Sequence, residues 1–137
     1  MGFFLSDLAG IQFIIEIITT FRKPMNTLYG IKNCDTVKKA RLWLDTQGIA
    51  YQFHDFRKDG LDLALLEKWE IILGWEALLN RRGTSWRKLD ESQREGVGRA
   101  KAMELMLGQP SLIKRPVLEA GRKTLIGFNA EEYSNAL

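Results

Sequence analysis

The sequence is poor in residue types that often build structure or carry chemistry, with one cysteine, one histidine and three prolines among its 137 residues. A single cysteine excludes an internal disulfide framework and any Cys-x-x-Cys pair, so a reducing, cytoplasmic location is expected. Any disulfide must then join Cys34 to another molecule. His54 and Cys34 lie far apart in sequence and have no further partners, so no metal site is predicted.

A long hydrophobic run and a strong charge of one sign are also missing. Asp7, Gln12 and Glu16 interrupt the N-terminal apolar segment before it reaches the ~18 residues that a membrane span needs. Arg22 and Lys23 follow that segment instead of preceding it, which is the reverse of a secretory signal. The net charge of +3 is too small to predict direct nucleic-acid binding without a clustered basic patch.

The length and the 45% hydrophobic content are enough for one domain with a core, and we expect a monomer. This domain is predicted to span residues 25–137, because the first strand pattern follows Met25 at once. Residues 1–24 are interpreted as an extended gene-model start or a loosely attached appendage. A true membrane-surface or partner helix is the alternative, since four apolar residues fall at helical spacing: Leu8, Ile11, Ile15 and Ile18.

After Met25 the pattern alternates between strand and helix. Residues 27–31 read as a strand, residues 36–47 as a helix ending before Gly48, and residues 51–56 as a second strand. Such a β-α-β unit should be right-handed with its two strands parallel.

The middle of the chain is predicted to be helical. Asp62 is expected to cap a helix that ends at Gly74 and carries an apolar stripe of Leu65, Leu66, Trp69, Ile72 and Leu73. A short helix over 75–79 and a polar, basic loop over 80–87 follow. Asp90 and Gln93 form a capping-box pattern that predicts a helix reaching Leu107, weakened in its first half by Gly96 and Gly98.

The last third returns to strand patterns. Residues 116–119 and 124–128 predict a hairpin, and Asn129 with Glu132 predicts a capped C-terminal helix. The whole order predicts an α/β domain with a thioredoxin-like fold: a four-stranded mixed sheet flanked by helices, with an inserted helical region.

Cys34 is the first candidate for chemistry, because it falls at or just before the N-terminus of the first predicted helix. Unpaired backbone N–H groups and the positive end of the helix dipole favour a thiolate there. Asp35 opposes ionisation, whereas three nearby cations favour it: Lys32, Lys38 and Lys39. A lone cysteine is more often a small buried hydrophobe, and that alternative stays open, although the polar flanks Asn33 and Thr36 favour a reactive site.

Arginines supply the candidates for binding an anion. Pro116 opens a predicted strand and can take a cis peptide bond, which would turn Arg115 toward the cysteine loop to clamp a carboxylate or oxyanion. Arg82, beside Arg81 in the basic loop, and Arg57, after the second strand, are further candidates. For each arginine the alternative is an ordinary solvated side chain. His54 is interpreted as structural.

Four segments resemble the arsenate reductase (ArsC/Spx) family, and its YffB branch in particular. They cover the cysteine loop, the end of the second strand, the basic loop and the Arg-Pro motif: residues 29–40, 53–58, 79–87 and 110–117. The resemblance implies a thioredoxin-like core, a nucleophilic Cys34, Arg115 before a cis Pro116, and glutathione as reductant with no tightly bound cofactor. The family's oxyanion arginines match Arg115, less closely Arg82, and loosely Arg57.

Two departures from the family pattern bear on function. Arsenate reductases of the family carry Gly-Thr-Ser-Arg after the cysteine, where this chain has Asp35 and the three residues that follow it. The acidic Asp35 disfavours a doubly charged arsenate. Val37 stands where Spx-type regulators often have a second cysteine. The leading hypothesis is therefore a glutathione-dependent thiol oxidoreductase, and the alternative is a non-catalytic Spx-like adaptor that binds RNA polymerase or another protein.

Overall fold

The computed structural model describes residues 10–15 and 26–137. Residues 10–15 are helical and exposed, with Ile11 at 53% and Phe13 at 64% of full exposure. Leu8 and Ile18, which belong to the same predicted apolar face, lie outside the described residues. The domain boundary at Met25 stays a prediction. No helix within the described ranges is long and apolar enough to cross a bilayer.

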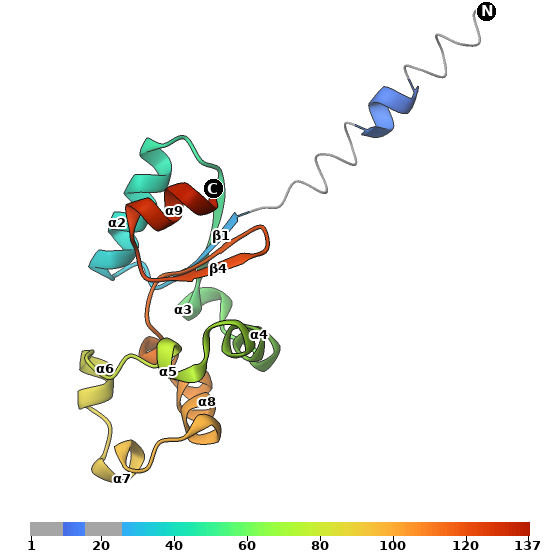
Figure 1. Cartoon of the computed structure of the whole chain (residues 1–137). Coiled ribbons are helices and arrows are strands. Elements are labelled where there is room, and N and C mark those ends of the chain that lie inside the picture. The colour runs from blue at the N-terminus through green and yellow to red at the C-terminus, as the bar shows by residue number, and fades with distance from the viewer. Residues whose placement is uncertain (1–9, 16–25) are drawn as a thin grey trace, which may run out of the picture.

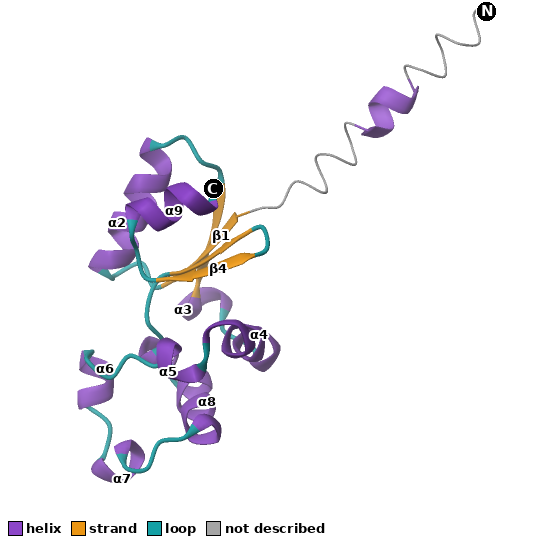
Figure 2. Cartoon of the chain, viewed as in Figure 1, coloured by secondary structure: helices purple, strands orange, loops and turns teal. Residues whose placement is uncertain are grey.

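Four strands form one mixed sheet in the order β2-β1-β3-β4. Figures 1 and 2 show this sheet between two groups of helices. β1 (Asn26–Gly30) runs parallel to β2 (Tyr51–Asp55) and antiparallel to β3 (Val117–Ala120), which pairs in turn with β4 (Lys123–Ile126). The predicted parallel β-α-β unit and the predicted hairpin are both confirmed. β1 lies inside the sheet, so the loop that follows it emerges between the ends of two neighbouring strands.

One face of the sheet is covered by α2 (Asp35–Thr46) and α9 (Ala130–Ala136), as Figure 1 shows. Side chains alternate between the two faces along a strand, and Leu28 and Leu118 point to this one. Their partners in the first core cluster are the buried side chains of the two helices and of β3: Ala40, Leu44, Ala120 and Tyr133.

The other face packs against the helical region inserted between β2 and β3 (Figure 1). Tyr29 and Val117 point to this face, where the fully buried Leu66, Trp69 and Met106 meet them in a second core cluster. The insertion contains α3 (Phe56–Asp59), α4 (Leu63–Leu73), α5 (Trp75–Leu78), α6 (Thr84–Arg87), α7 (Glu91–Arg94), α8 (Arg99–Gly108) and the 3-10 helix η1 (Pro110–Leu112).

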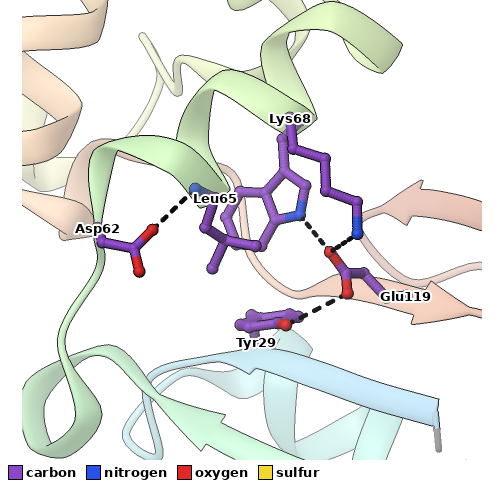
Figure 3. Close-up of polar contacts among 6 residues, drawn as sticks. Tyr29, Asp62, Leu65, Lys68 and Glu119 are labelled. Carbon is purple, nitrogen blue, oxygen red and sulfur yellow. Dashed lines mark hydrogen bonds and ion pairs between the residues drawn. The ribbon is translucent and has the colours of Figure 1, made fainter.

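A polar contact joins this helical region to the sheet (Figure 3). The Glu119 carboxylate on β3 accepts hydrogen bonds from Trp69 Nε1 at 2.9 Å, Lys68 Nζ at 3.2 Å and the Tyr29 hydroxyl at 3.3 Å. Burial, followed by the negative charge of Glu119 and its hydrogen bond, raises the pKa of Tyr29 to about 12. At the start of α4, Asp62 accepts a 2.8 Å bond from the Leu65 amide, which confirms the predicted N-cap.

Three details of the predicted helical region were wrong. Residues 84–87 form α6 instead of a loop. The predicted helix from Asp90 to Leu107 is split into α7 and α8, because Gly96 takes a left-handed φ of 62° that a helix does not allow. Ile72, assigned to the buried stripe of α4, is 50% exposed. The capping box between Asp90 and Gln93 is present and opens the short α7.

Candidate active site

Cys34 is the N-cap residue of α2, as the sequence predicted. A turn at residues 32–33 leads to it from β1, and its backbone is extended, with φ −130° and ψ 125°. Its carbonyl accepts the first helical hydrogen bond, from the Lys38 amide at 2.9 Å. The thiol makes no capping bond and the residue is only partly buried. The sulfur is therefore neither sealed in the core nor committed to holding the helix.

The position of Cys34 is set by the packing of α2. Val37, Ala40 and Leu44 are fully buried on one side of this helix, at the 3–4 residue spacing of a helical face. The opposite side is exposed and cationic at Lys38 and Lys39. Burial of the apolar face thus fixes the position of the N-terminus of α2, where the unpaired N–H groups of the first turn lie next to Cys34.

Arg115 and Pro116 lie at the same edge of the sheet as the cysteine loop. Val117 pairs with Tyr29, and β3 is antiparallel to β1, so the residues before Val117 continue alongside the chain that follows Gly30. The peptide bond between Arg115 and Pro116 is cis, as predicted. Arg115 Nη1 donates a 2.8 Å hydrogen bond to the Ser111 carbonyl, and Nε is buried without a partner in the described structure.

Arg57 reaches the same edge from β2. Gly30 pairs with Asp55, the last residue of β2, and Asp55 caps α3 by accepting a 2.9 Å bond from the Arg57 amide. The exposed Arg57 lines a pocket of about 270 Å³ together with Ile31, Phe56 and residues 108–111. Ile31, which lines this pocket, lies three residues before Cys34 in the chain.

Arg82 lies on the loop beside η1, because the Asn80 amide donates a 2.8 Å bond to the Leu112 carbonyl. Its backbone is held at both ends: the Arg82 amide donates to Asn80 Oδ1 at 3.1 Å, and its carbonyl accepts from Arg87 Nη2 at 2.9 Å. The residue is exposed, and none of the contacts among the described residues brings its guanidinium to Cys34. Its predicted role stays a prediction.

The neighbouring Arg81 has a packing role. Its guanidinium lies over the rings of Trp75 at 5.5 Å and Trp86 at 5.8 Å, the geometry of a cation–π contact. His54 is also engaged, since its Nε2 lies 2.7 Å from the Gly60 carbonyl and its ring lies 4.9 Å from that of Tyr29. Both contacts agree with the structural interpretation of His54.

Sequence reasoning missed Ser111 and Gln109. The Ser111 carbonyl accepts from Arg115, and its hydroxyl accepts a 2.8 Å hydrogen bond from the Ser85 hydroxyl. Ser111 and Gln109 both line the pocket beside Ile31. The only sequence feature that could have identified Ser111 and Gln109 was their position just before the Arg-Pro motif. Within residues 10–15 and 26–137, no group of three or more potential His, Cys, Asp or Glu metal ligands gathers at one point.

Comparison with known proteins adds a family match. The sequence model of the ArsC family matches residues 29–136. The global transcriptional regulator Spx of Streptococcus mutans is 30% identical over 112 residues, which cover 79% of this chain and 80% of that protein.

Two solved structures are more similar to this chain. A YffB protein is 55% identical with a TM-score of 0.80, covering 82% of this chain and 99% of its own. An arsenate reductase (ArsC) related protein from Brucella melitensis is 53% identical with a TM-score of 0.67, covering 81% of this chain and 92% of its own. With the observed sheet order, these neighbours confirm the predicted thioredoxin-like fold.

Proposed function

The chain belongs to the ArsC family, and we propose that it is a glutathione-dependent thiol oxidoreductase in which the Cys34 thiolate is the nucleophile. The match to the ArsC family and the similarity to an arsenate reductase (ArsC) related protein support thiol oxidoreductase chemistry. The observation that carries the proposal is the position of Cys34: a partly exposed N-cap at the edge of the sheet where Arg115 and Pro116 also lie.

The proposed chemistry takes two thiol–disulfide exchanges. The Cys34 thiolate attacks the glutathione sulfur of a mixed disulfide R–S–S–G, forms the Cys34–S–S–G bond and releases RS⁻, which takes a proton from water. A glutathione thiolate then attacks the glutathione sulfur of that adduct, releases the Cys34 thiolate and leaves as glutathione disulfide. External glutathione is needed because the chain has no second cysteine to resolve the adduct. A reducing cytoplasm would supply this co-substrate.

Arg115 is proposed to hold the carboxylate or oxyanion of the substrate. Among the described residues its guanidinium makes one hydrogen bond, from Nη1 to the Ser111 carbonyl, which anchors one end of the group and leaves other donors for a ligand. Pro116 fixes the backbone on which Arg115 stands. Arg82 and Arg57 would contribute further positive charge, Arg82 from the loop beside η1 and Arg57 from the pocket wall.

Disulfides are preferred over arsenate as substrates because of Asp35. This exposed carboxylate is the first residue of α2, next to the nucleophile, and it repels a doubly charged oxyanion. A mixed disulfide brings no charge to the reacting sulfur itself. The proposed substrate is therefore a disulfide that contains glutathione.

The test is Cys34→Ser. We expect this variant to form no glutathione adduct when incubated with glutathione disulfide, as measured by intact mass, and to lose disulfide reduction with glutathione as reductant. Thr36→Ala, an exposed change two residues away, is the matched control and should keep both reactions. Undiminished turnover by Cys34→Ser would exclude Cys34 as the nucleophile.

A second candidate function rests on the 30% identity to Spx of Streptococcus mutans. In this alternative the chain is a non-catalytic adaptor that binds RNA polymerase or another protein. Purified polymerase should then be retained by immobilised wild-type protein and equally by Cys34→Ser, with no dependence on glutathione. Failure to retain polymerase, together with the loss of disulfide reduction in Cys34→Ser, would favour the enzyme.

A further inference from the structure

The pocket beside the cysteine loop is built from three separate parts of the chain. Ile31 follows β1, Phe56 and Arg57 belong to α3, and residues 108–111 join α8 to η1. Its volume of about 270 Å³ is below the ~300–1,000 Å³ of a site for a whole drug-sized ligand. It therefore fits one arm of a larger molecule, such as a single amino-acid residue.

Arg57 places a cation on the wall of this pocket, and the neighbouring carboxylates form no ion pair with it within the described residues. Asp55 Oδ1 accepts from the Arg57 amide at 2.9 Å, and Asp59 Oδ2 accepts from the Asp55 amide at 3.1 Å. Both nearby carboxylates are thus bonded to backbone N–H groups. None of the ion pairs found in the described ranges includes Arg57. Its guanidinium is free to bind an anion at the pocket wall.

The rest of the pocket is suited to part of a peptide. Phe56 and Ile31 are buried and give it an apolar side that methylene groups can cover. Gln109, an exposed amide, can bond to a peptide group. Three residues span at most about 11 Å, so the backbone of Ile31, which lines the pocket, lies within that distance of the Cys34 backbone. A tripeptide attached through its central sulfur can extend one arm across it.

We propose that this pocket binds a carboxylate arm of the glutathionyl group that becomes bonded to Cys34, with Arg57 donating hydrogen bonds to the carboxylate. The proposal rests on the function proposed above and assigns one end of its substrate. It makes Arg57 a specificity residue: disulfides with a carboxylate on this arm react faster than neutral ones.

The first exchange step tests this without a complete catalytic cycle. The Cys34 thiolate attacks glutathione disulfide, forms Cys34–S–S–G and releases one glutathione thiolate. The second-order rate constant is followed by acid quenching and intact mass, with bis(2-hydroxyethyl) disulfide as a neutral comparison. We expect Arg57→Gln to slow the reaction with glutathione disulfide about tenfold, the usual weight of one charge-assisted contact, and to leave the neutral disulfide unchanged. Arg57→Lys should keep part of the preference.

Lys58→Gln is the matched charge control. Lys58 is the next residue along α3, is exposed, and does not line the pocket, so this variant removes the same charge without removing the contact. It should change the rate with glutathione disulfide less than twofold at physiological ionic strength. An equal loss in Lys58→Gln and Arg57→Gln would overturn the proposal in favour of general attraction between opposite charges.

A second variant tests the pocket by filling it. A Cβ added at Gly108 meets no atom within 4 Å and Gly108 lines the pocket, so Gly108→Leu adds apolar volume at the pocket wall. It should slow the reaction of Cys34 with glutathione disulfide and leave the reaction with the neutral disulfide unchanged. Gly98→Leu, at the other end of α8 and equally open, is the control and should slow neither.

The outcomes separate the two proposals. Suppose that wild-type protein reacts with both disulfides, and that Arg57→Gln or Gly108→Leu reacts with glutathione disulfide as fast as wild type does. That result would overturn the pocket assignment and leave the proposed thiol chemistry standing. Wild-type protein that forms no adduct with either disulfide would overturn the proposed function itself.

Discussion

Gly30, the last residue of β1, lies directly against Val37 in the first turn of α2. A Cβ at position 30 would be 2.8 Å from Val37 Cγ2, closer than real carbon atoms approach. Val37 is fully buried, so it has little room to move. This contact sets how closely the helix carrying Cys34 approaches the strand that leads to it.

We therefore expect Gly30→Ala to lower the free energy of unfolding by about 1–3 kcal/mol, the usual cost of overpacking a core. It should also slow alkylation of Cys34 by iodoacetamide, because α2 must shift. Val37→Ala makes room for the added methyl group, so the double variant should lose less stability than the two single variants summed. Urea unfolding measures the coupling, and additive losses would contradict it. Gly98→Ala, where a Cβ meets no atom within 4 Å, is the control.

Removing the Glu119 carboxylate should weaken the attachment of the helical region to the sheet. Trp69 is fully buried and its Nε1 donates to Glu119, so Glu119→Ala leaves that N–H without a partner. An unpaired buried donor costs about 1–3 kcal/mol. We expect a loss of about 2 kcal/mol in urea unfolding, against less than about 0.5 kcal/mol for Glu67→Ala, an exposed glutamate on α4. Equal losses would show that the bond to Trp69 contributes nothing.

Tyr29 should make stability fall at high pH. Its folded-state pKa is raised to about 12, first by burial and then by Glu119, whereas the unfolded value is about 10. Between these values the unfolded chain loses the phenolic proton and the folded protein keeps it, so the free energy of unfolding decreases as pH rises. Full stabilisation by this group is present below pH 10.

The loss should reach about 2 kcal/mol between pH 10 and 12. Urea unfolding measured across this range should show a shallower decline in Tyr29→Phe than in wild type, apart from any constant offset. Burial also raises the pKa of Tyr133, which leaves a remaining slope of the same sign. An identical slope in wild type and Tyr29→Phe would contradict the prediction.

Arg115 should act through the shape of its guanidinium as well as its charge. Arg115→Ala is expected to lower kcat/KM for reduction of glutathione mixed disulfides at least about tenfold, and Arg115→Lys to recover only part, since an ammonium group cannot make the same forked contact. Arg122→Ala, in the exposed turn between β3 and β4, is the control. Full activity in Arg115→Lys would reduce the role of Arg115 to its charge alone.

Local patterns were enough to predict the frame of the fold. The strands, α2, the cap at Asp62 and the terminal helix followed from apolar periodicity and capping residues that act within a few positions of each other. The split between α7 and α8 was harder, because Asp90 and Gln93 open a helix while Gly96 ends it within a turn. Propensity over so short a stretch does not decide where a helix breaks.

The sequence by itself determined that Cys34 begins a helix and that Arg115 precedes a proline at a strand start, because both depend on neighbours in the chain. Tertiary structure alone decided which arginines share the edge of the sheet. The register of β1 against β3 brings Arg115 alongside the chain after Gly30, and the pocket joins Arg57 to Ile31, whereas Arg82 stays on a separate loop. These contacts, like the hydrogen bond between Tyr29 and Glu119, join residues that are distant in sequence. They are determined by how the helices pack on the two faces of the sheet.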